Sequence, residues 1–511
     1  MSTLPDPRVV AAVRALEAER LESEARPALR VAIVAANTFE HDSRLLRTAR
    51  ALAGDGHDVT VLAFEAPGLP ARESLGDRIE LRRLSVDRRV VSVFRPLPEP
   101  VRARLAGLLG FEPAAMSLPP SSPRGFERVR APIRRLVEIG AHQWRVGPWS
   151  DAVVSAVPDA DVFHCKALVA LPVIAAAAER TGSRFVYDLA DLHTEAARLA
   201  RMPRLVRSLV RRREARWVRR AALLTAVSDG VASEAARRFH VGRPVVVLNC
   251  PPAWRPEDPE PPRSDRLRRA TAIGPERPIV LYQGGFSVDR GIEELIAALE
   301  HESLRALDAA VVLLGYGRLA DRLRAEAARR PGRLFVLDAV PPSELLEWTA
   351  SADLGYVGQP ARTLNQRLNL ANKLFESIMA GVPVLVSDGT EHCRLVSADA
   401  LGACTPIEPA AIARAAAALL GRSPEERDAL RRHCRTVALD RYTWERQQGA
   451  LVSAYRRLAA EVARPAAPEE TASQPAESRV GGSPRLRDVP AAGRTVRRRL
   501  HVPSLRRRAG S

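Results

Sequence analysis

Lysine is almost absent from this chain of 511 residues. Of its 78 basic residues, 76 are arginine, and the only two lysines are Lys166 and Lys373. Each lysine is expected where a parallel strand runs into a helix. Lysine offers a compact ammonium, whereas arginine offers a planar fork of fixed geometry. The two positions therefore hold either leftover surface lysines or two charges that reach into one cleft.

Other residue types are also scarce. Aromatic residues make up 5% of the chain, which argues against base-stacking platforms and hence against a nucleic-acid partner. The five cysteines are odd in number and have no paired metal-ligand spacing. This pattern favours buried thiols in a reducing compartment over a disulfide framework or a zinc site. We therefore expect no metal and no resident cofactor.

Long apolar runs are missing as well. The longest candidate, residues 167–178, is interrupted by Pro172 and falls short of the roughly 20 residues that span a bilayer. The first 22 residues are polar and lack a signal-peptide pattern. A cytoplasmic location is expected, with peripheral contact to the inner face of the plasma membrane as a further expectation.

Charge supports an anionic partner. The formal net charge is +18, and the tail 464–511 alone holds eleven arginines against four acids. A second basic stretch, 126–144, has apolar residues at helical spacing. It is either an amphipathic helix on an anionic membrane or a helix that packs on a sheet with a solvated basic face. Phosphate-bearing substrates, membranes and nucleic acids all fit a positive charge.

Apolar runs that alternate with helical stretches predict an α/β protein with parallel, doubly wound sheets. We expect a helical extension (1–29), a first Rossmann-like domain (30–249) with a basic insertion at about 87–148, and a Pro-rich hinge (250–272). A second Rossmann-like domain (273–442), a docking helix (443–463) and a disordered basic tail (464–511) follow. Two such domains suggest ligand binding in a cleft between them, at the carboxyl ends of strands.

Glycines follow two strands of the second domain. Gly284 and Gly285 come directly after one strand, and Arg290 precedes the next helix, an arrangement that suits a phosphate. Gly315 and Gly317 close another strand. They either let a base or ribose approach the backbone or form an ordinary tight turn.

The segment NLANKLFESIMAGVPVLVSD is the most specific motif. Asn372, Lys373 and Glu376 fall on the first turns of one helix. A carboxylate there can accept hydrogen bonds from a ribose diol, and a lysine near the helix start can neutralise a diphosphate. The alternative is a surface ion pair between Lys373 and Glu376, worth only tenths of a kcal/mol.

With these motifs the chain resembles the retaining glycosyltransferases of family 4, which have the GT-B fold. The resemblance covers residues 30–84 and 150–460, and it includes the Asp42 and Arg44 pair of the opening segment. It implies a nucleotide-diphosphate sugar as co-substrate on the second domain and an acceptor on the first. Glu376 would hold the ribose, and Arg290 and Lys373 would hold the diphosphate without a metal.

The chain departs from the family pattern at three positions. A commonly acidic position is Leu368, and two positions that usually hold histidine are Lys166 and Ala190. We take His164, Lys166 and Asp191 as catalytic candidates, with Lys166 as a substitute for the lost histidine. Candidates for the acceptor side are Asn37, Asp42, Arg44, Asp188 and His193.

The resulting hypothesis is a glycosyltransferase that acts on an envelope glycan, a lipid-linked acceptor or a secondary metabolite, with retention of configuration. The missing histidines motivate an alternative, a degenerate GT-B protein that binds nucleotide or glycan without turnover.

Overall fold

The computed structural model describes residues 27–40, 42–86, 146–200, 202–258 and 260–463. The predicted N-terminal extension and basic insertion lie outside these residues, apart from 27–29 and 146–148. The predicted amphipathic stretch 126–144 and the predicted disordered tail also lie outside them.

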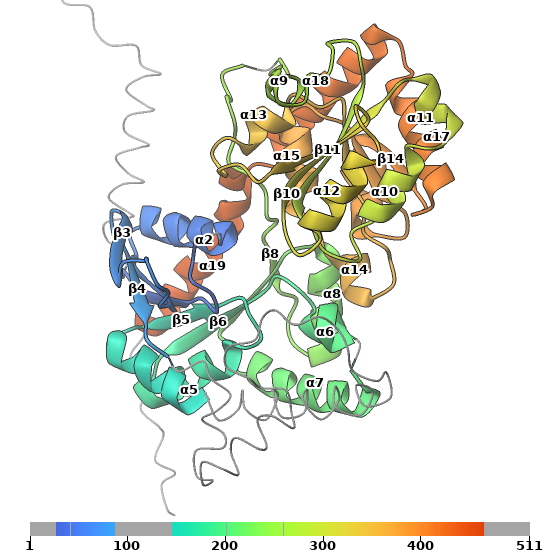
Figure 1. Cartoon of the computed structure of the whole chain (residues 1–511). Coiled ribbons are helices and arrows are strands. Elements are labelled where there is room, and N and C mark those ends of the chain that lie inside the picture. The colour runs from blue at the N-terminus through green and yellow to red at the C-terminus, as the bar shows by residue number, and fades with distance from the viewer. Residues whose placement is uncertain (1–26, 41, 87–145, 201, 259, 464–511) are drawn as a thin grey trace, which may run out of the picture. The chain divides into compact units, whose positions relative to one another are not determined.

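The first domain is built on an eight-stranded sheet (Figure 1) in the order β3-β4-β2-β1-β5-β6-β7-β8. All neighbouring strands are parallel except β3, which runs antiparallel to β4. The strands are β1 (Arg30–Val34), β2 (Asp58–Phe64), β3 (Arg72–Gly76), β4 (Ile79–Leu84), β5 (Val162–Cys165), β6 (Arg184–Leu189), β7 (Leu223–Ala226) and β8 (Val245–Val246). Strand β3 was not predicted, because its residues are almost all exposed and show no apolar alternation.

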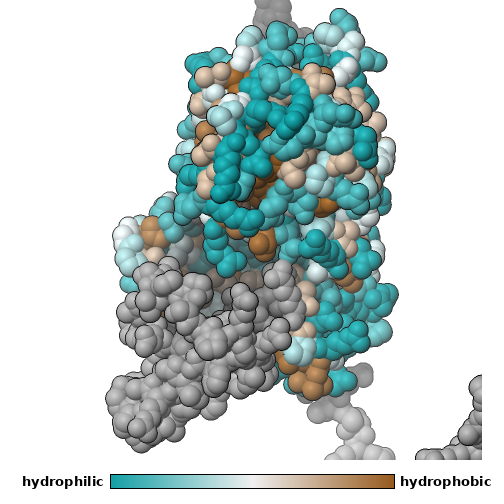
Figure 2. Space-filling model, turned by 45° about the vertical axis from the view of Figure 1, so that its right-hand side comes forward, coloured by the Kyte–Doolittle hydropathy of each residue, from teal (hydrophilic) through white to brown (hydrophobic). Residues whose placement is uncertain are grey.

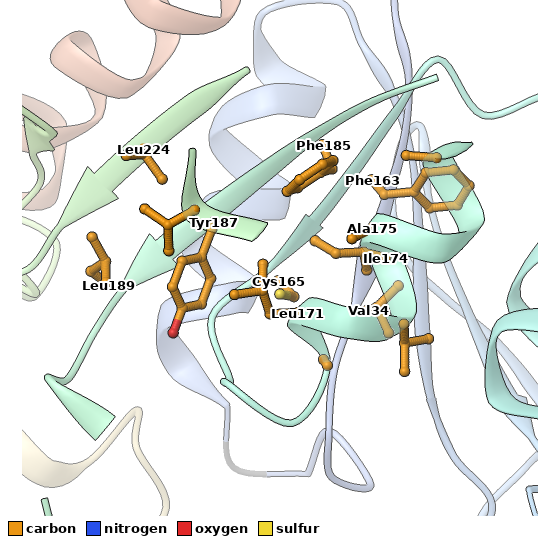
Figure 3. Close-up of a cluster of buried hydrophobic side chains, with 14 of the residues drawn as sticks. Val34, Phe163, Cys165, Leu171, Ile174, Ala175, Phe185, Tyr187, Leu189 and Leu224 are labelled. Carbon is orange, nitrogen blue, oxygen red and sulfur yellow. The ribbon is translucent and has the colours of Figure 1, made fainter. Parts of the chain in front are cut away.

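Helices cover both faces of this sheet (Figure 1): α2 (Ser43–Gly54), α5 (Leu171–Thr181), α6 (Ala197–Ala200), α7 (Arg204–Val218) and α8 (Asp229–Phe239), with a short 3-10 turn, η2, at His193–Glu195. One core lies between the sheet and α5, where Phe163, Ile174, Phe185 and Tyr187 interdigitate (Figure 3). Burial of these large side chains supplies most of the driving force for this layer.

The second domain has a six-stranded sheet in the order β11-β10-β9-β12-β13-β14, and every neighbouring pair is parallel. The strands are β9 (Ile279–Gly285), β10 (Ala310–Tyr316), β11 (Leu334–Asp338), β12 (Leu354–Val357), β13 (Val384–Ser387) and β14 (Gly402–Thr405). Its helices are α9 (Arg266–Thr271), α10 (Ile292–Ala298), α11 (Glu302–Ala306), α12 (Ala320–Ala328), α13 (Leu345–Thr349), α14 (Leu364–Leu368), α15 (Asn372–Met379), α16 (Glu391–Ala398), α17 (Pro409–Leu420) and α18 (Pro424–Arg441). The predicted α/β class with two Rossmann-like domains is confirmed.

The last helix, α19 (Trp444–Ala463), packs on the sheet of the first domain (Figure 1). Its buried residues Leu451, Tyr455 and Leu458 share a core with Val31 and Leu52 of the chain's opening βα unit. The chain thus ends its described part on the domain in which it began.

The cysteines correct one expectation. Cys393 of α16 and Cys404 of β14 form a disulfide, so the prediction that all five thiols are free is wrong for this pair. Cys165, Cys250 and Cys434 are buried and unpaired, as expected. Among the described residues, no helix is both long and apolar enough to cross a membrane.

Candidate functional site

The second sheet changes winding direction between β9 and β12, and open α/β sheets bind ligands at such a switch point. Gly284 and Gly285 end β9 at this place. Gly284 has φ +112°, a left-handed conformation that favours glycine. A Cβ built there would lie 3.6 Å from Nζ of Lys373, which places the lysine directly against the end of β9.

Lys373 lies in the first turn of α15 and points to an aromatic ring. Its Nζ is 3.8 Å from the ring centroid of Tyr282, a cation–π contact. Burial lowers the pKa of Lys373 to about 7, the charge of Arg290 acts in the same direction, and Glu376 opposes the shift. Lys373 makes no ion pair within the part of the chain that the structure describes, so the expected surface pair with Glu376 does not form.

Glu376, one turn further along α15, is held by a neutral partner. Its Oε2 accepts a hydrogen bond of 2.8 Å from Nε2 of Gln283, and Oε1 of Gln283 in turn accepts one of 2.7 Å from Thr349. Burial raises the pKa of Glu376, although the hydrogen bond from Gln283 opposes the shift. The chain of contacts orients the carboxylate and leaves its other oxygen available for a hydroxyl donor.

Arg290 lies just before α10 and completes the cationic side of this cluster. Its NH1 donates to Oε1 of Gln359 at 3.3 Å, and the backbone N–H of Gln359 donates to Ser387. Two cations, Arg290 and Lys373, therefore flank the carboxyl end of β9. We name the group Tyr282, Gln283, Arg290, Lys373 and Glu376 the β9 cluster.

Gly315 and Gly317 have a packing role in the structure. A Cβ at Gly315 would lie 2.0 Å from the carbonyl oxygen of Gly284, and one at Gly317 would lie 2.4 Å from that of Phe286. Because both residues lack a side chain, the backbone at the end of β10 can pack directly on the backbone at the end of β9 and just after it. Of the two alternatives, this favours a tight structural turn over a direct ligand contact.

Asn372 is also engaged by protein. Its Oδ1 accepts a hydrogen bond from Asn249, whose own Oδ1 accepts one from Arg47 of α2. Asn372 thus joins the start of α15 to the segment that precedes the hinge, which differs from the donor contact expected from its place in the motif.

In the first domain, the winding direction changes between β1 and β5, and Lys166 follows β5. Its Nζ lies 2.5 Å from Oδ1 of Asp42, whose side chain is 1% exposed. Asp42 also accepts a hydrogen bond of 2.8 Å from Asn37 and caps α2 through the backbone N–H of Leu45. Three predicted site residues, Asn37, Asp42 and Lys166, are thus in contact at one switch point.

The two histidines differ in placement. His193 is partly exposed and hydrogen-bonds the carbonyl oxygen of Lys166 at 3.1 Å, which places it beside this group. His164 is buried, and its Nδ1 lies 2.7 Å from the hydroxyl of Tyr455. Burial lowers the pKa of His164 to about 4. Its ring lies in the interior against α19, which argues against the direct catalytic contact predicted for it.

Arg44 and Asp188 form a buried, bidentate ion pair at 2.6 and 2.7 Å, and Arg44 also donates to the carbonyl oxygen of Val247. Although burial alone raises the pKa of Asp188, the charge and hydrogen bonds of Arg44 outweigh it and hold this pKa at about 2. The pair ties α2 to β6. Both side chains are buried and engaged by protein, whereas the sequence predicts them on the acceptor side.

Asp191 accepts hydrogen bonds from two asparagines of the segment around α14. Oδ1 of Asp191 lies 2.8 Å from Nδ2 of Asn365 and 2.6 Å from Nδ2 of Asn369. Asn369 also donates to the carbonyl oxygen of Ala190 at 3.1 Å. The departures at Ala190 and Leu368 thus lie close to one another, in a network of amide side chains.

Sequence reasoning missed Gln283, Asn365 and Asn369. A signal existed for Gln283, since it is a polar residue at the end of an otherwise apolar strand. Asn369 stands at the start of the NLANKLFE motif, but no role was predicted for it there, and Asn365 gave no signal because NQRL is typical of a loop. Within the described residues, no group of three or more His, Cys, Asp or Glu side chains is arranged to hold a metal ion.

Comparison with solved structures shows the same two-domain architecture in glycosyltransferases. Sucrose-phosphate synthase of Thermosynechococcus elongatus superposes with a TM-score of 0.62 at 16% identity, over 85% of this chain and all of the other. Trehalose-phosphate synthase of Burkholderia vietnamiensis gives 0.58 at 14% identity over 85% of this chain and all of the other. Anabaena HepE with UDP-glucose gives 0.56 at 15% identity, over 84% of this chain and all of the other. The fold is GT-B. At these identities the likeness concerns the fold alone.

Sequence comparison adds information on the second domain. Residues 277–422, which contain the whole β9 cluster, match the family described as Glycosyl transferases group 1. A GDP-mannose-dependent α-(1-6)-phosphatidylinositol dimannoside mannosyltransferase of Mycobacterium tuberculosis is 29% identical over 199 residues, which is 39% of this chain. The chain spans about half the length of this curated relative, with 48% covered.

Proposed function

We propose that the protein is a nucleotide-sugar-dependent glycosyltransferase of the GT-B type, related to family 4. The observation that carries the proposal is the β9 cluster. The ammonium of Lys373, which pairs with no carboxylate of the described residues, and the oriented carboxylate of Glu376 occupy the switch point of the second sheet. This point lies within the segment that matches group 1 glycosyl transferases. The comparisons favour this function over a degenerate GT-B protein that only binds its ligand.

In the proposed reaction, the bond between the anomeric carbon and the diphosphate oxygen breaks, and the diphosphate leaves with the electron pair. A hydroxyl oxygen of the acceptor bonds to the anomeric carbon on the same face and passes its proton to the departing diphosphate oxygen, so configuration is retained. Lys373 and Arg290 lie where they would neutralise the departing diphosphate, and Glu376 where it would accept hydrogen bonds from the ribose. We propose that these fixed charges take the place of a metal.

On the acceptor side we propose an envelope glycan or a lipid-linked glycan. The support is the curated relative, which by its name acts on a phosphatidylinositol dimannoside with GDP-mannose as donor. GDP-mannose is therefore the first donor to test. In the first domain, Lys166 and His193 are two partly exposed polar groups at the switch point, and we propose that they face the acceptor and the transferred sugar.

Calorimetric titration of the full-length protein with GDP-, UDP- and ADP-sugars, followed by a transfer assay with lipid-linked acceptors, tests the proposal. One nucleotide sugar should bind and turn over, and Lys373→Ala should weaken its binding at least about tenfold. The matched control Arg414→Ala on α17 should leave binding unchanged. Binding without turnover for every acceptor would favour the degenerate protein. No binding of any nucleotide sugar would contradict both functions.

A further inference from the structure

Helix α7 (Arg204–Val218) exposes large apolar side chains, which is unusual in this molecule. Only five large hydrophobic residues of the described part are well exposed, and two of them, Leu205 and Leu209, belong to α7. Their exposures are 73% and 52%. They lie one helical turn apart, so their side chains form one continuous apolar patch near the start of the helix.

The same helix is strongly basic and carries one acid, Glu214, which is buried. Arg207 and Arg211 lie 3.4 and 4.0 Å from the carboxylate of Glu195. Four further arginines are exposed and make no ion pair with any residue that the structure describes; they are Arg204, Arg212, Arg213 and Arg216. The surface charge of α7 is therefore positive, and the described residues neutralise it only at Arg207 and Arg211.

The exposed leucines and arginines share one face. At 100° per residue, positions 205, 209, 212, 213 and 216 fall within an arc of about 100°. Ala215 and Val218 lie outside this arc and are buried against the domain. We name Leu205, Leu209, Arg212, Arg213 and Arg216 the α7 face. It is apolar in the first half of the helix and cationic in the second half.

Figure 2 shows a hydrophobic patch at the lower end of the coloured surface, the end at which Figure 1 places α5 and α7. Two exposed leucines beside three arginines that form no ion pair with a described residue are the two features of a helix that lies in a membrane interface. Leucine enters the boundary of the acyl chains, and arginine attracts anionic headgroups.

We propose that the α7 face docks on the surface of an anionic lipid bilayer. A nucleic acid would use the arginines but not the leucines. A second copy of the chain would meet the same positive charge on its own α7, which opposes self-association. Docking through α7 goes beyond the proposed glycosyl transfer, because it requires neither donor nor turnover.

Vesicle flotation of the full-length protein tests the proposal without an activity readout. We expect binding to phosphatidylcholine vesicles that contain about one third phosphatidylglycerol, and little binding to pure phosphatidylcholine. The variant Arg212→Gln/Arg213→Gln/Arg216→Gln should bind the anionic vesicles at least about tenfold more weakly at 0.15 M salt. The matched control Arg414→Gln/Arg422→Gln/Arg432→Gln removes three exposed arginines from the second domain and should bind nearly as wild type does.

The basic tail 464–511 is a competing source of attraction, and the control variant separates it from α7. Equal losses for the two triple variants would mean that binding follows net charge alone, which would overturn the proposal. All substituted residues are exposed, and thermal melts check that each variant folds.

Insertion of the leucines gives an independent readout. An environment-sensitive dye on Leu209→Cys should shift to the blue with anionic vesicles, and Leu205→Ser/Leu209→Ser should weaken flotation. No dye shift would overturn the proposal. The proposal would also be overturned if Leu205→Ser/Leu209→Ser floated normally and light scattering showed a changed oligomeric state, since the α7 face would then join two copies. If the variant Arg212→Gln/Arg213→Gln/Arg216→Gln lost binding to duplex DNA but floated as wild type does, the α7 face would be a nucleic-acid surface and the proposal would be overturned.

Discussion

Nζ of Lys373 lies 3.8 Å from the ring centroid of Tyr282, and no carboxylate of the described chain pairs with it. An aromatic face stabilises an ammonium by about 0.5–2 kcal/mol, less than a buried ion pair with good geometry. The lysine therefore keeps most of its capacity to bind an incoming anion.

The first prediction concerns the size of the Lys373 contribution. Lys373→Met keeps the stem of the side chain on Tyr282 and removes the charge. Affinity for the nucleotide sugar should fall roughly 10- to 100-fold, because a charge-assisted hydrogen bond is worth about 1.5–3 kcal/mol. Isothermal titration measures the change. Tyr282→Phe, which keeps the ring, serves as the control, and a similar loss there would point to general disturbance of the site.

The second prediction is a pH dependence of donor binding. Since the pKa of Lys373 is lowered to about 7, the free protein holds a charged lysine below that pH and a neutral one above it. A diphosphate binds the charged form, so affinity should be constant below pH 7 and fall up to about tenfold per pH unit above it. A nucleotide sugar has no phosphate group that titrates in this range. Lys373→Arg should give a flat profile, and a sloping one would assign the effect to another group.

The third prediction separates ribose recognition from general binding. If Glu376 accepts hydrogen bonds from the ribose, Glu376→Gln should weaken a ribonucleotide sugar roughly tenfold and its 2′-deoxy analogue much less. The two ligands and two proteins form a thermodynamic cycle, and its coupling energy should be about 1 kcal/mol. Equal losses for both ligands would show that Glu376 does not contact the 2′-hydroxyl.

The fourth prediction concerns Lys166. Lys166→Ala leaves the buried carboxylate of Asp42 with Asn37 and the N-terminus of α2 as its remaining partners, which should destabilise the fold by about 1–3 kcal/mol. If Lys166 also substitutes for the lost histidine, kcat should fall by far more than donor affinity. Urea unfolding and steady-state kinetics measure the two effects. An unchanged kcat in the folded variant would leave Lys166 with the structural role alone.

The fifth prediction compares two ion pairs of the first domain. Arg44→Leu removes one partner of a buried pair and should cost about 3–5 kcal/mol of unfolding free energy. The pair of Arg30 with Asp161 is half exposed, and Arg30→Leu should cost less than about 1 kcal/mol. Denaturant melts of both variants give the comparison. Equal costs would mean that the interior around Asp188 admits water.

The positions of most strands and the place of the β9 cluster were open to prediction from the sequence, since parallel strands are short apolar runs and their carboxyl ends carry Gly284, Gly285 and the lysines. The contacts that decide the roles of single residues were not. Whether Arg44 faces solvent or Asp188 depends on how α2 lies against β6, and nothing in either segment encodes that pairing locally. For the same reason, the sequence motif did not show that Asn372 bonds to Asn249 across 123 positions.

Helix α19 has a consequence for synthesis of the chain. Val31 and Leu52 leave the ribosome some 400 positions before their apolar partners Leu451, Tyr455 and Leu458. Until then, one face of the nascent first domain stays uncovered while the second domain is translated. Completion of the first domain is thus a late step, because it depends on a contact of very high sequence separation. During that interval the uncovered apolar face is a natural target for chaperones.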